Sequence, residues 1–311
     1  MPNRSPLLFA QALAPALALA LSALYAAAAQ AACPPAERDA ASLQQLRGAK
    51  FEGLDSASRD ALARGLLDCL ADSRPELRDE IAFEALSTWM RAGALSTDTL
   101  QHLRRELSTR LVAPDPQGFS RPFAALALAE VARVDRLKPF LAADERGQLV
   151  DAATAYLRGI TDHRGFDAVQ GWRHGVAHGA DLLMQLGLNP ALSPAQLDAI
   201  VQAIASQVAP AGEHFYIYGE PERLARPIVY IARRPTGPGE AAYWERWLVA
   251  LTAPAPLPNW DAAFKTQAGL ARRHNTQAFV QVLYVMLRES GDATLQQRLL
   301  PGLLAALKAL P

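Results

Sequence analysis

The sequence predicts an all-α fold made of stacked antiparallel helix pairs, as in a HEAT-like α-solenoid or an α/α-superhelix. Apolar residues recur at spacings of three and four along the chain that follows the first 31 residues. No run of four to eight residues alternates cleanly between apolar and polar with turn signals at both ends. An irregular all-α bundle is the alternative, and a weak internal repeat, described below, favours the stack.

Composition limits the possible partners. The chain has 311 residues, of which 50% are hydrophobic and 20% charged, so it can bury a large core as one extended domain or two compact ones. Lys and Arg total 31, and so do Asp and Glu. This balance gives no electrostatic reason to expect nucleic acid or an anionic membrane surface as the partner.

Residues 1–31 are expected to be a signal peptide. Arg4 is the only charge there, the run from Leu7 to Ala29 is apolar, and Ala29-Gln30-Ala31 is a small-residue cleavage site. Cleavage after Ala31 would deliver a periplasmic or secreted protein, which meets the membrane only through the signal segment before cleavage. The alternative is an uncleaved membrane anchor, because the apolar run is about long enough to span a bilayer.

The two cysteines, Cys33 and Cys69, are expected to pair. Two thiols in an oxidising compartment usually form a disulfide. The bond would tie the start of an N-terminal segment, residues 32–74, to the first helices. The alternative is two unrelated thiols, with Cys69 buried among neighbouring leucines. A helical repeat domain is expected over residues 75–311.

The repeat is marked by arginines that open five expected helices roughly every 40 to 50 residues. They are Arg78, Arg121, Arg173, Arg223 and Arg273. Equivalent helix starts lie side by side along one rim of a solenoid, and solenoids bind along such faces. The rim would carry Asp79, Glu80, Arg121, Arg173, His174, Glu222, Arg223, Arg273, His274 and Asn275.

Several helix ends can be placed from capping patterns. Ser193-Pro194-Ala195-Gln196 is a capping box with proline at the first helical position, and its helix should run to about Val208. Ser290-Gly291-Asp292 is typical of a helix stop followed by a new cap. Proline and glycine cluster in the longer expected loops, which are 113–118, 209–212, 235–239 and 253–258.

A polar stripe in an otherwise apolar helix is the main candidate site. At about 100° per residue, His174, His178, Asp181 and Gln185 share one face of a helix rich in Gly, Ala, Val and Leu. Such a helix is buried, and its polar groups need partners or a ligand. The catalytic candidates are therefore His174, His178 and Asp181.

Three interpretations of this stripe stay open. Two histidines four residues apart could chelate one divalent metal, so His174 and His178 are metal candidates although no cofactor is firmly predicted. Asp181 is better placed to orient His178 than to join the metal. The second interpretation is a metal-free site that exchanges protons or binds a polar ligand. The third is a satisfied structural network between helices.

Ligand-binding candidates come from three further clusters. The loop before the stripe gathers five polar or aromatic side chains around Gly165 and Gly171, namely Asp162, His163, Arg164, Asp167 and Trp172. From this loop we select Asp162, Arg164 and Trp172, although Asp162 and Arg164 could simply pair within a structured turn. The run from Glu213 to Arg223 mixes aromatic residues, acids and glycine, and the run from Arg272 to Gln277 opens a helix. From these two runs we select the outer members of the site, which are Glu220, Arg223 and His274.

The sequence resembles the bacterial family catalogued as domain of unknown function 2785. The resemblance rests on the motif Asp162-x-Arg164-Gly165-Phe166-Asp167, on Gly171-Trp172-x-His174-x3-His178-x-Ala180-Asp181-Leu182-Leu183, and on Gly219 to Leu224 with His274-Asn275. It covers roughly Pro75 to Leu287 and implies an all-helical fold with HEAT-like pairs. Exported members share the Cys-Pro start. The resemblance carries no established activity.

Two functions of different class follow from these residues. The first is a binding or scaffolding module for a peptide, a glycan or an envelope partner, with small-molecule ligands also allowed. The second is an enzyme of hydrolase or lyase type, with His174 or His178 as general base and Asp181 as its orienting carboxylate, or with a metal. The motifs of serine hydrolases, phosphate-binding loops and dinucleotide-binding folds are absent from the sequence.

Overall fold

The computed structural model describes residues 33–235 and 240–311, all within one compact unit. The expected signal peptide, residues 1–31, lies outside the described residues.

The described chain is mostly helical and has almost no strand, which confirms the all-α prediction. Its α-helices are α1 (Ala40–Gly48), α2 (Ser56–Gly65), α3 (Pro75–Leu77), α4 (Glu84–Arg91), α5 (Thr97–Val112), α6 (Ser120–Leu137), α7 (Ala143–Arg158), α8 (Gly175–Gly187), α9 (Pro194–Val208), α10 (Glu220–Ala232), α11 (Ala241–Leu251), α12 (Gln267–Glu289) and α13 (Ala293–Ala309). Shorter helical segments are η1 (Asp68–Ala71), the π-helix η2 (Arg78–Phe83) and η3 (Trp260–Lys265).

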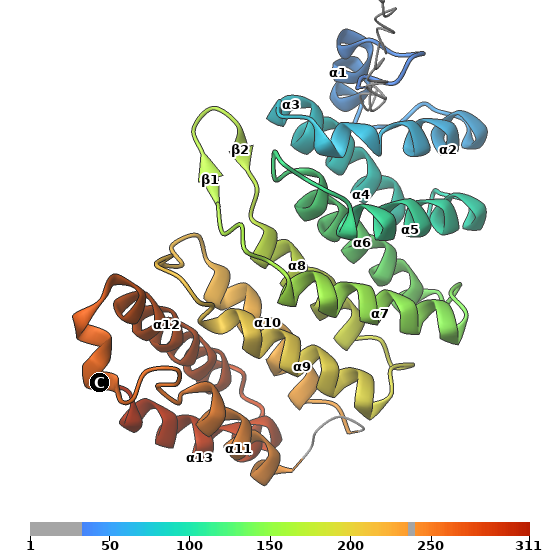
Figure 1. Ribbon diagram of the computed structural model, residues 1–311. Coiled ribbons are helices and arrows are strands. Elements are labelled where there is room, and N and C mark those ends of the chain that lie inside the picture. Colours follow the sequence, from blue (N-terminus) through green and yellow to red (C-terminus); the bar gives the residue numbers. More distant parts are fainter. Residues whose placement is uncertain (1–32, 236–239) are drawn as a thin grey trace, which may run out of the picture. The chain divides into compact units, whose positions relative to one another are not determined.

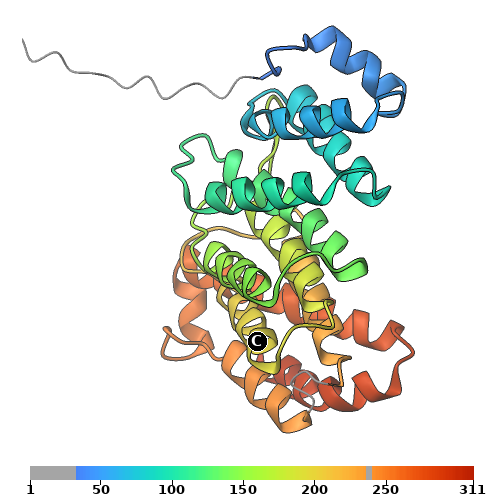
Figure 2. The ribbon, with the colours of Figure 1, turned by 90° about the vertical axis from the view of Figure 1, so that its right-hand side faces the viewer.

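The helices stack in two rows. One row places α4, α6, α8, α10 and α12 in successive contact, and the other does the same for α2, α5, α7 and α9. Contacts between α5 and α6, α7 and α8, and α9 and α10 join the rows into pairs, and the layers follow one another down the stack (Figures 1 and 2). The prediction of stacked antiparallel helix pairs is therefore confirmed.

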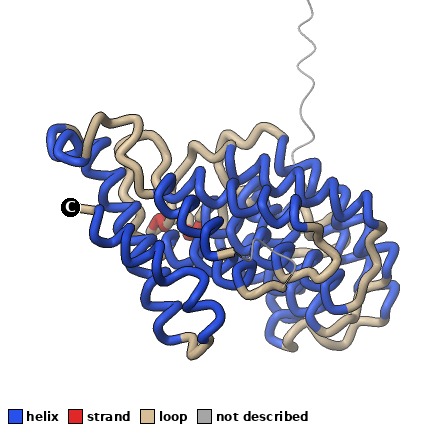
Figure 3. Tube along the Cα trace, turned by 90° about the horizontal axis from the view of Figure 1, so that it is seen from below, coloured by secondary structure: helices blue, strands red, loops and turns tan. Residues whose placement is uncertain are grey.

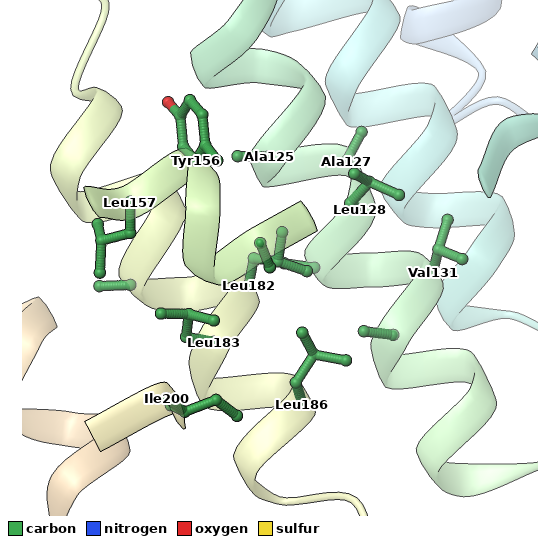
Figure 4. Close-up of a cluster of buried hydrophobic side chains, with 14 of the residues drawn as sticks. Ala125, Ala127, Leu128, Val131, Tyr156, Leu157, Leu182, Leu183, Leu186 and Ile200 are labelled. Carbon is green, nitrogen blue, oxygen red and sulfur yellow. The ribbon is translucent and has the colours of Figure 1, made fainter. Parts of the chain in front are cut away.

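The core is continuous because each helix of the first row buries its apolar face against both neighbours. Helix α8 is the clearest case, since it is apolar around most of its circumference. Its Leu182, Leu183 and Leu186 meet side chains from α6, α7 and α9, among them Leu128 and Ile200 (Figure 4). All five of these side chains are at most 2% exposed. The same packing fixes the start of α8, where the candidate site lies.

The capping patterns place the helix ends as predicted. Helix α9 runs from Pro194 to Val208, and its capping box is complete: the Gln196 amide donates to Ser193 Oγ at 3.3 Å, and the Ser193 amide donates to Gln196 Oε1 at 2.9 Å. Asp292 caps α13 by accepting from the Leu295 amide at 3.0 Å. These ends depend only on neighbouring residues, which explains why the sequence locates them.

The expected helix start at Arg273 is wrong. Helix α12 begins six residues earlier, at Gln267, where Thr266 Oγ1 accepts from the Gly269 amide at 3.0 Å. That threonine cap lies outside the arginine pattern. Helix α10 likewise begins at Glu220, ahead of Arg223, and it contains Pro227.

A short β-hairpin replaces the loop expected before α8. Strands β1 (Phe166–Asp167) and β2 (Gly171–Trp172) pair antiparallel, with Phe166 opposite Trp172. The pairing continues toward α8, because the Arg173 amide donates to the Gly165 carbonyl at 2.9 Å. The hairpin stands out from the helical rows (Figure 1), and its strands are the red segments of Figure 3. Strands of two residues are too short to give an alternating pattern.

The disulfide between Cys33 and Cys69 is present, as expected. It joins the start of the described chain to η1, where Cys69 is fully buried. Within residues 33–235 and 240–311, no helix is both long enough and apolar enough to cross a bilayer.

Candidate functional site

A cleft of about 600 Å³ lies beside the hairpin, and we call it the hairpin cleft. It contains Asp162 and Arg164, two of the ligand-binding residues predicted from the sequence. Its lining residues are Thr161, Asp162, His163, Arg164, Gly165, Phe166, Asp167, Gln170, Arg173, His214 and Tyr218. The lining therefore combines charged, imidazole and aromatic groups from the hairpin region and from the loop that precedes α10.

Asp162 and Arg164 hold each other in place at the cleft. Arg164 Nε donates to Asp162 Oδ1 at 2.8 Å, and its Nη2 donates to the other carboxylate oxygen. Burial raises the pKa of Asp162, but the hydrogen bonds and charge of Arg164 outweigh burial, so the pKa is lowered overall. Both side chains are about half exposed, at 42% for Asp162 and 52% for Arg164. The pair thus forms the expected structured turn and also lines the cleft.

Two glycines allow close contacts with residues that line the cleft. At Gly118, which has φ +78°, an added Cβ would lie 2.6 Å from Arg164 Nη2 and from Asp162 Oδ2. At Gly165 an added Cβ would lie 2.0 Å from a ring carbon of Tyr218. These positions are glycine because a side chain would displace the ion pair or the Tyr218 ring.

His163 and His214 belong to two of the clusters found in the sequence, but neither was selected there as a ligand-binding residue. Their rings stack with centroids 5.4 Å apart and planes 18° apart. In both rings Nε2 is buried and has no hydrogen-bond partner, and burial lowers both pKa values. The two histidines are 51 residues apart in the printed sequence, on different loops, so no local pattern links them.

The loop that carries His214 is anchored from α12. Asn275 is 1% exposed; its Oδ1 accepts from the Tyr216 amide and its Nδ2 donates to the His214 carbonyl, both at 2.9 Å. The neighbouring His274 was a predicted ligand-binding residue, but it does not line the cleft. Its exposed ring packs beside Phe215 at 5.3 Å between centroids, and its Nε2 lies 3.3 Å from the Tyr216 carbonyl oxygen.

His174 and His178 lie together, as the stripe predicted, with ring centroids 5.7 Å apart. His174 is not a helical residue, because it caps α8 in the left-handed conformation with φ 54°. The Trp172 ring stacks on it at 4.8 Å and 26°, while Phe123 meets His178 edge-on at 5.3 Å. Neither histidine lines the hairpin cleft.

Each of the two imidazoles has one buried ring nitrogen without a hydrogen-bond partner. These atoms are His174 Nε2 and His178 Nδ1. Interactions with the Tyr218 backbone and the Pro122 backbone raise the pKa of His174 and of His178, respectively, but burial outweighs them and lowers both pKa values.

Glu220 is the nearest carboxyl group to this pair. It is 2% exposed, and its Oε1 lies 4.0 Å from His174 Nε2. Its Oε2 accepts from the Tyr218 amide at 2.8 Å. Burial raises the pKa of Glu220. Glu220 was predicted as an outer ligand-binding residue, and the structure places it in the interior beside His174.

Asp181 does not orient His178, which corrects the role expected for it. Arg223 Nε donates to Asp181 Oδ1 at 2.7 Å, and Nη2 of the same guanidinium forms an ion pair with Oδ2. The packing of α10 on α8 brings this guanidinium to Asp181, and its fork matches a carboxylate better than one imidazole N–H can. Neither Arg223 nor Trp172 lines the hairpin cleft.

Metal binding by His174 and His178 stays a prediction. In the described ranges, no group of three or more His, Cys, Asp or Glu side chains has an arrangement that could hold a metal ion.

We expect His174 to stay neutral until the pH approaches 4, because burial, followed by the charge of Arg223, lowers its pKa to about 4. Its ordinary value is 6.5, so between these two pH values the unfolded chain binds more protons than the folded chain. The contribution of His174 to the free energy of unfolding therefore falls as the pH is lowered from about 6.5 to 4. The raised pKa of Glu220 acts in the opposite direction over the acid range.

The measurement is an NMR titration of the His174 ring, assigned with the variant His174→Gln. A midpoint near 4 is the expected result, and a midpoint near 6.5 would mean that the ring is not desolvated as described.

The fold and the site define the class of this protein: an all-α helical-repeat protein with a polar cleft beside a hairpin that interrupts the stack. The chain belongs to the family described as protein of unknown function (DUF2785), whose model matches residues 107–285. The match includes every residue that lines the hairpin cleft and both buried histidines. Searches of curated proteins and of solved structures find no match.

Proposed function

We propose that this chain is an exported binding module that holds a polar ligand of glycan or peptide type in the hairpin cleft. The observation that carries the proposal is the cleft itself, about 600 Å³ in volume and lined by Asp162, Arg164 and Tyr218 among others. Small-ligand sites are typically about 300 to 1,000 Å³, with a few fixed polar groups that orient the ligand. Export is supported by the signal-like N-terminus and by a disulfide, which persists in oxidising compartments.

The wall of the cleft suits recognition because its polar groups are already oriented. Arg164 is held by both oxygens of Asp162 and also donates to the Gln117 carbonyl at 3.3 Å. One face of Tyr218 is fixed by its contact with Gly165. A ligand then loses little free energy to ordering of the protein, which is the usual benefit of preorganisation.

A titration tests the proposal. The probes added to the folded protein are N-acetylglucosamine oligosaccharides, short alanine peptides and soluble cell-wall fragments. The heat of binding is measured by calorimetry, and the melting temperature is measured with and without each probe. Saturable binding should raise the melting temperature, because a ligand that binds only the folded state stabilises it. The variant Arg164→Met should weaken binding by about 10-fold or more, since it removes a charged donor.

The control is Arg105→Met, which removes an exposed arginine of α5 away from the cleft lining. Equal loss of affinity in both variants, or no binding of any probe to the unmodified protein, would contradict the proposal.

The second candidate is an enzyme of hydrolase or lyase type, and one observation favours it. His174 and His178 each have a buried ring nitrogen without a hydrogen-bond partner, and His174 lies beside Glu220, a carboxyl group whose pKa is raised by burial. A neutral imidazole beside a carboxyl group whose pKa is raised is an arrangement used for general base and general acid catalysis. In this role Glu220 replaces Asp181, which is held by Arg223.

The two functions differ in their response to His178→Gln. An acid/base role predicts that conversion of a bound probe, followed by NMR of the products, falls by about 10² to 10⁴. A binding role predicts unchanged affinity and no conversion in either protein. If the variant fails to fold, His174→Gln serves the same purpose.

A further inference from the structure

Arg173 lines the hairpin cleft, and among the described residues its guanidinium forms no ion pair. It is 6% exposed. Its Nε donates to the Gln117 carbonyl at 3.0 Å and its Nη2 donates to Gln170 Oε1 at 2.7 Å. Its guanidinium carbon lies 4.2 Å from the centroid of the Phe119 ring. All three partners are electrically neutral.

The other buried arginines of the described chain each have a carboxylate partner. Arg78, Arg104 and Arg146 are each 8% exposed or less, and each forms an ion pair. Their partners are Asp79 at 2.7 Å, Glu145 at 2.8 Å and Asp135 at 2.8 Å, respectively. Within the described residues no carboxylate is within the 4.0 Å ion-pair distance of Arg173. Arg173 is therefore the exception among four buried arginines.

The carboxylates around Arg173 already have other partners. Asp162 is bound by Arg164. Asp115 caps the start of α6, accepting from the Gly118 and Arg121 amides. Asp167 Oδ1 accepts from the Val169 and Gln170 amides within the hairpin turn. These groups act on Arg173 only through space, and they are opposed by Arg164.

A second guanidinium, that of Arg78, adds positive charge near Arg173. Arg78 is fully buried, and its guanidinium carbon also lies 4.2 Å from the Phe119 centroid. Arg78 and Arg173 therefore share one aromatic ring, and among the described residues Asp79 is the one carboxylate that forms an ion pair with either of them. Burying a charge without a counter-charge is costly, and a ligand that supplies one recovers part of that cost on binding.

We propose that the hairpin cleft selects an anionic ligand, whose carboxylate or phosphate group pairs with Arg173. This inference rests on the proposed binding function and names the charge class of its ligand. A planar guanidinium can donate two parallel hydrogen bonds to two oxygens of a carboxylate or of a phosphate, so the pairing is geometrically specific. His163 and His214 also line the cleft, and each has a buried Nε2 without a hydrogen-bond partner.

Matched probes test the charge requirement in the unmodified protein. Affinity is measured by calorimetry for N-acetyl-alanyl-alanine and its C-terminal amide, for a galacturonate disaccharide and its neutral galactose counterpart, and for inorganic phosphate. At least one acid should bind about 10-fold or more tighter than its neutral partner, as expected for one charge-assisted hydrogen bond. Comparison of the carboxylates with phosphate identifies which anion the cleft takes.

The variant Arg173→Gln should remove the difference between acid and neutral probe, whereas Arg105→Gln should retain it. If Arg173→Gln does not fold, the ratio of the affinities for acid and neutral probes, measured in the unmodified protein, still tests whether the cleft selects an anion. Equal binding of acids and neutral partners in the cleft would overturn this inference and leave the proposed function intact. Failure of every probe to bind would overturn both.

Discussion

Replacing Arg78 by methionine is expected to lower the free energy of unfolding by about 3 to 5 kcal/mol, the usual cost of removing one partner of a buried ion pair. Arg78 is fully buried and pairs with Asp79 at 2.7 Å. It also donates to the Asp72 carbonyl at 2.9 Å and to the Gln170 carbonyl at 2.8 Å. Methionine fills the volume but leaves these three acceptors without a donor.

Urea unfolding followed by circular dichroism measures this loss. Arg47→Met is the matched control, because Arg47 pairs with Glu80 and Glu84 on the surface, where side chains are 39% to 50% exposed. Exposed pairs typically contribute about 0 to 1 kcal/mol. A loss for Arg78→Met no larger than that of the control would show that the buried guanidinium does not secure the hairpin to the helical rows.

Removing the disulfide is expected to cost about 3 to 4 kcal/mol in the double variant Cys33→Ser/Cys69→Ser. The bond spans a sequence separation of 36 residues, and a loop of this length gives an entropic stabilisation of that order. Cys69 is also fully buried, so a serine there adds the cost of an inserted hydroxyl.

The double variant and the unmodified protein are compared by thermal unfolding with and without a reducing agent. Reduction should lower the melting temperature of the unmodified protein only. If reduction leaves that temperature unchanged, the bond does not contribute to the stability of the folded state.

The helical rows were predictable because their signals are local. Apolar periodicity sets which face of α8 is buried, and the Ser193 and Asp292 caps set where α9 and α13 begin. The arginine repeat identified the first-row helices, although Arg223 and Arg273 lie inside α10 and α12 and do not mark their starts. Neighbouring residues determine each of these features, so one sequence is sufficient to find them.

The candidate site was predictable only in part. Asp162, Arg164, His174 and His178 were selected because they lie close together in the sequence. Other contacts of the site join residues that are distant in sequence: Arg223 of α10 pairs with Asp181, and His214 stacks on His163 from another loop. Such pairs are fixed by the packing of helices and loops that are distant in sequence, which no single pattern encodes.

The hairpin was missed for a related reason. Its strands contain two residues each, and the Asp167 side chain closes its turn. This arrangement looks like a loop in the sequence, yet it forms one side of the cleft.

The most direct test of the central claim, that the hairpin cleft is the ligand site, is hydrogen–deuterium exchange with and without a probe that stabilises the protein. Protection confined to residues 161–173 and 213–218, which carry the cleft lining, is the predicted result. Protection centred on the C-terminal helices α11 and α13, with these two segments unchanged, would contradict it.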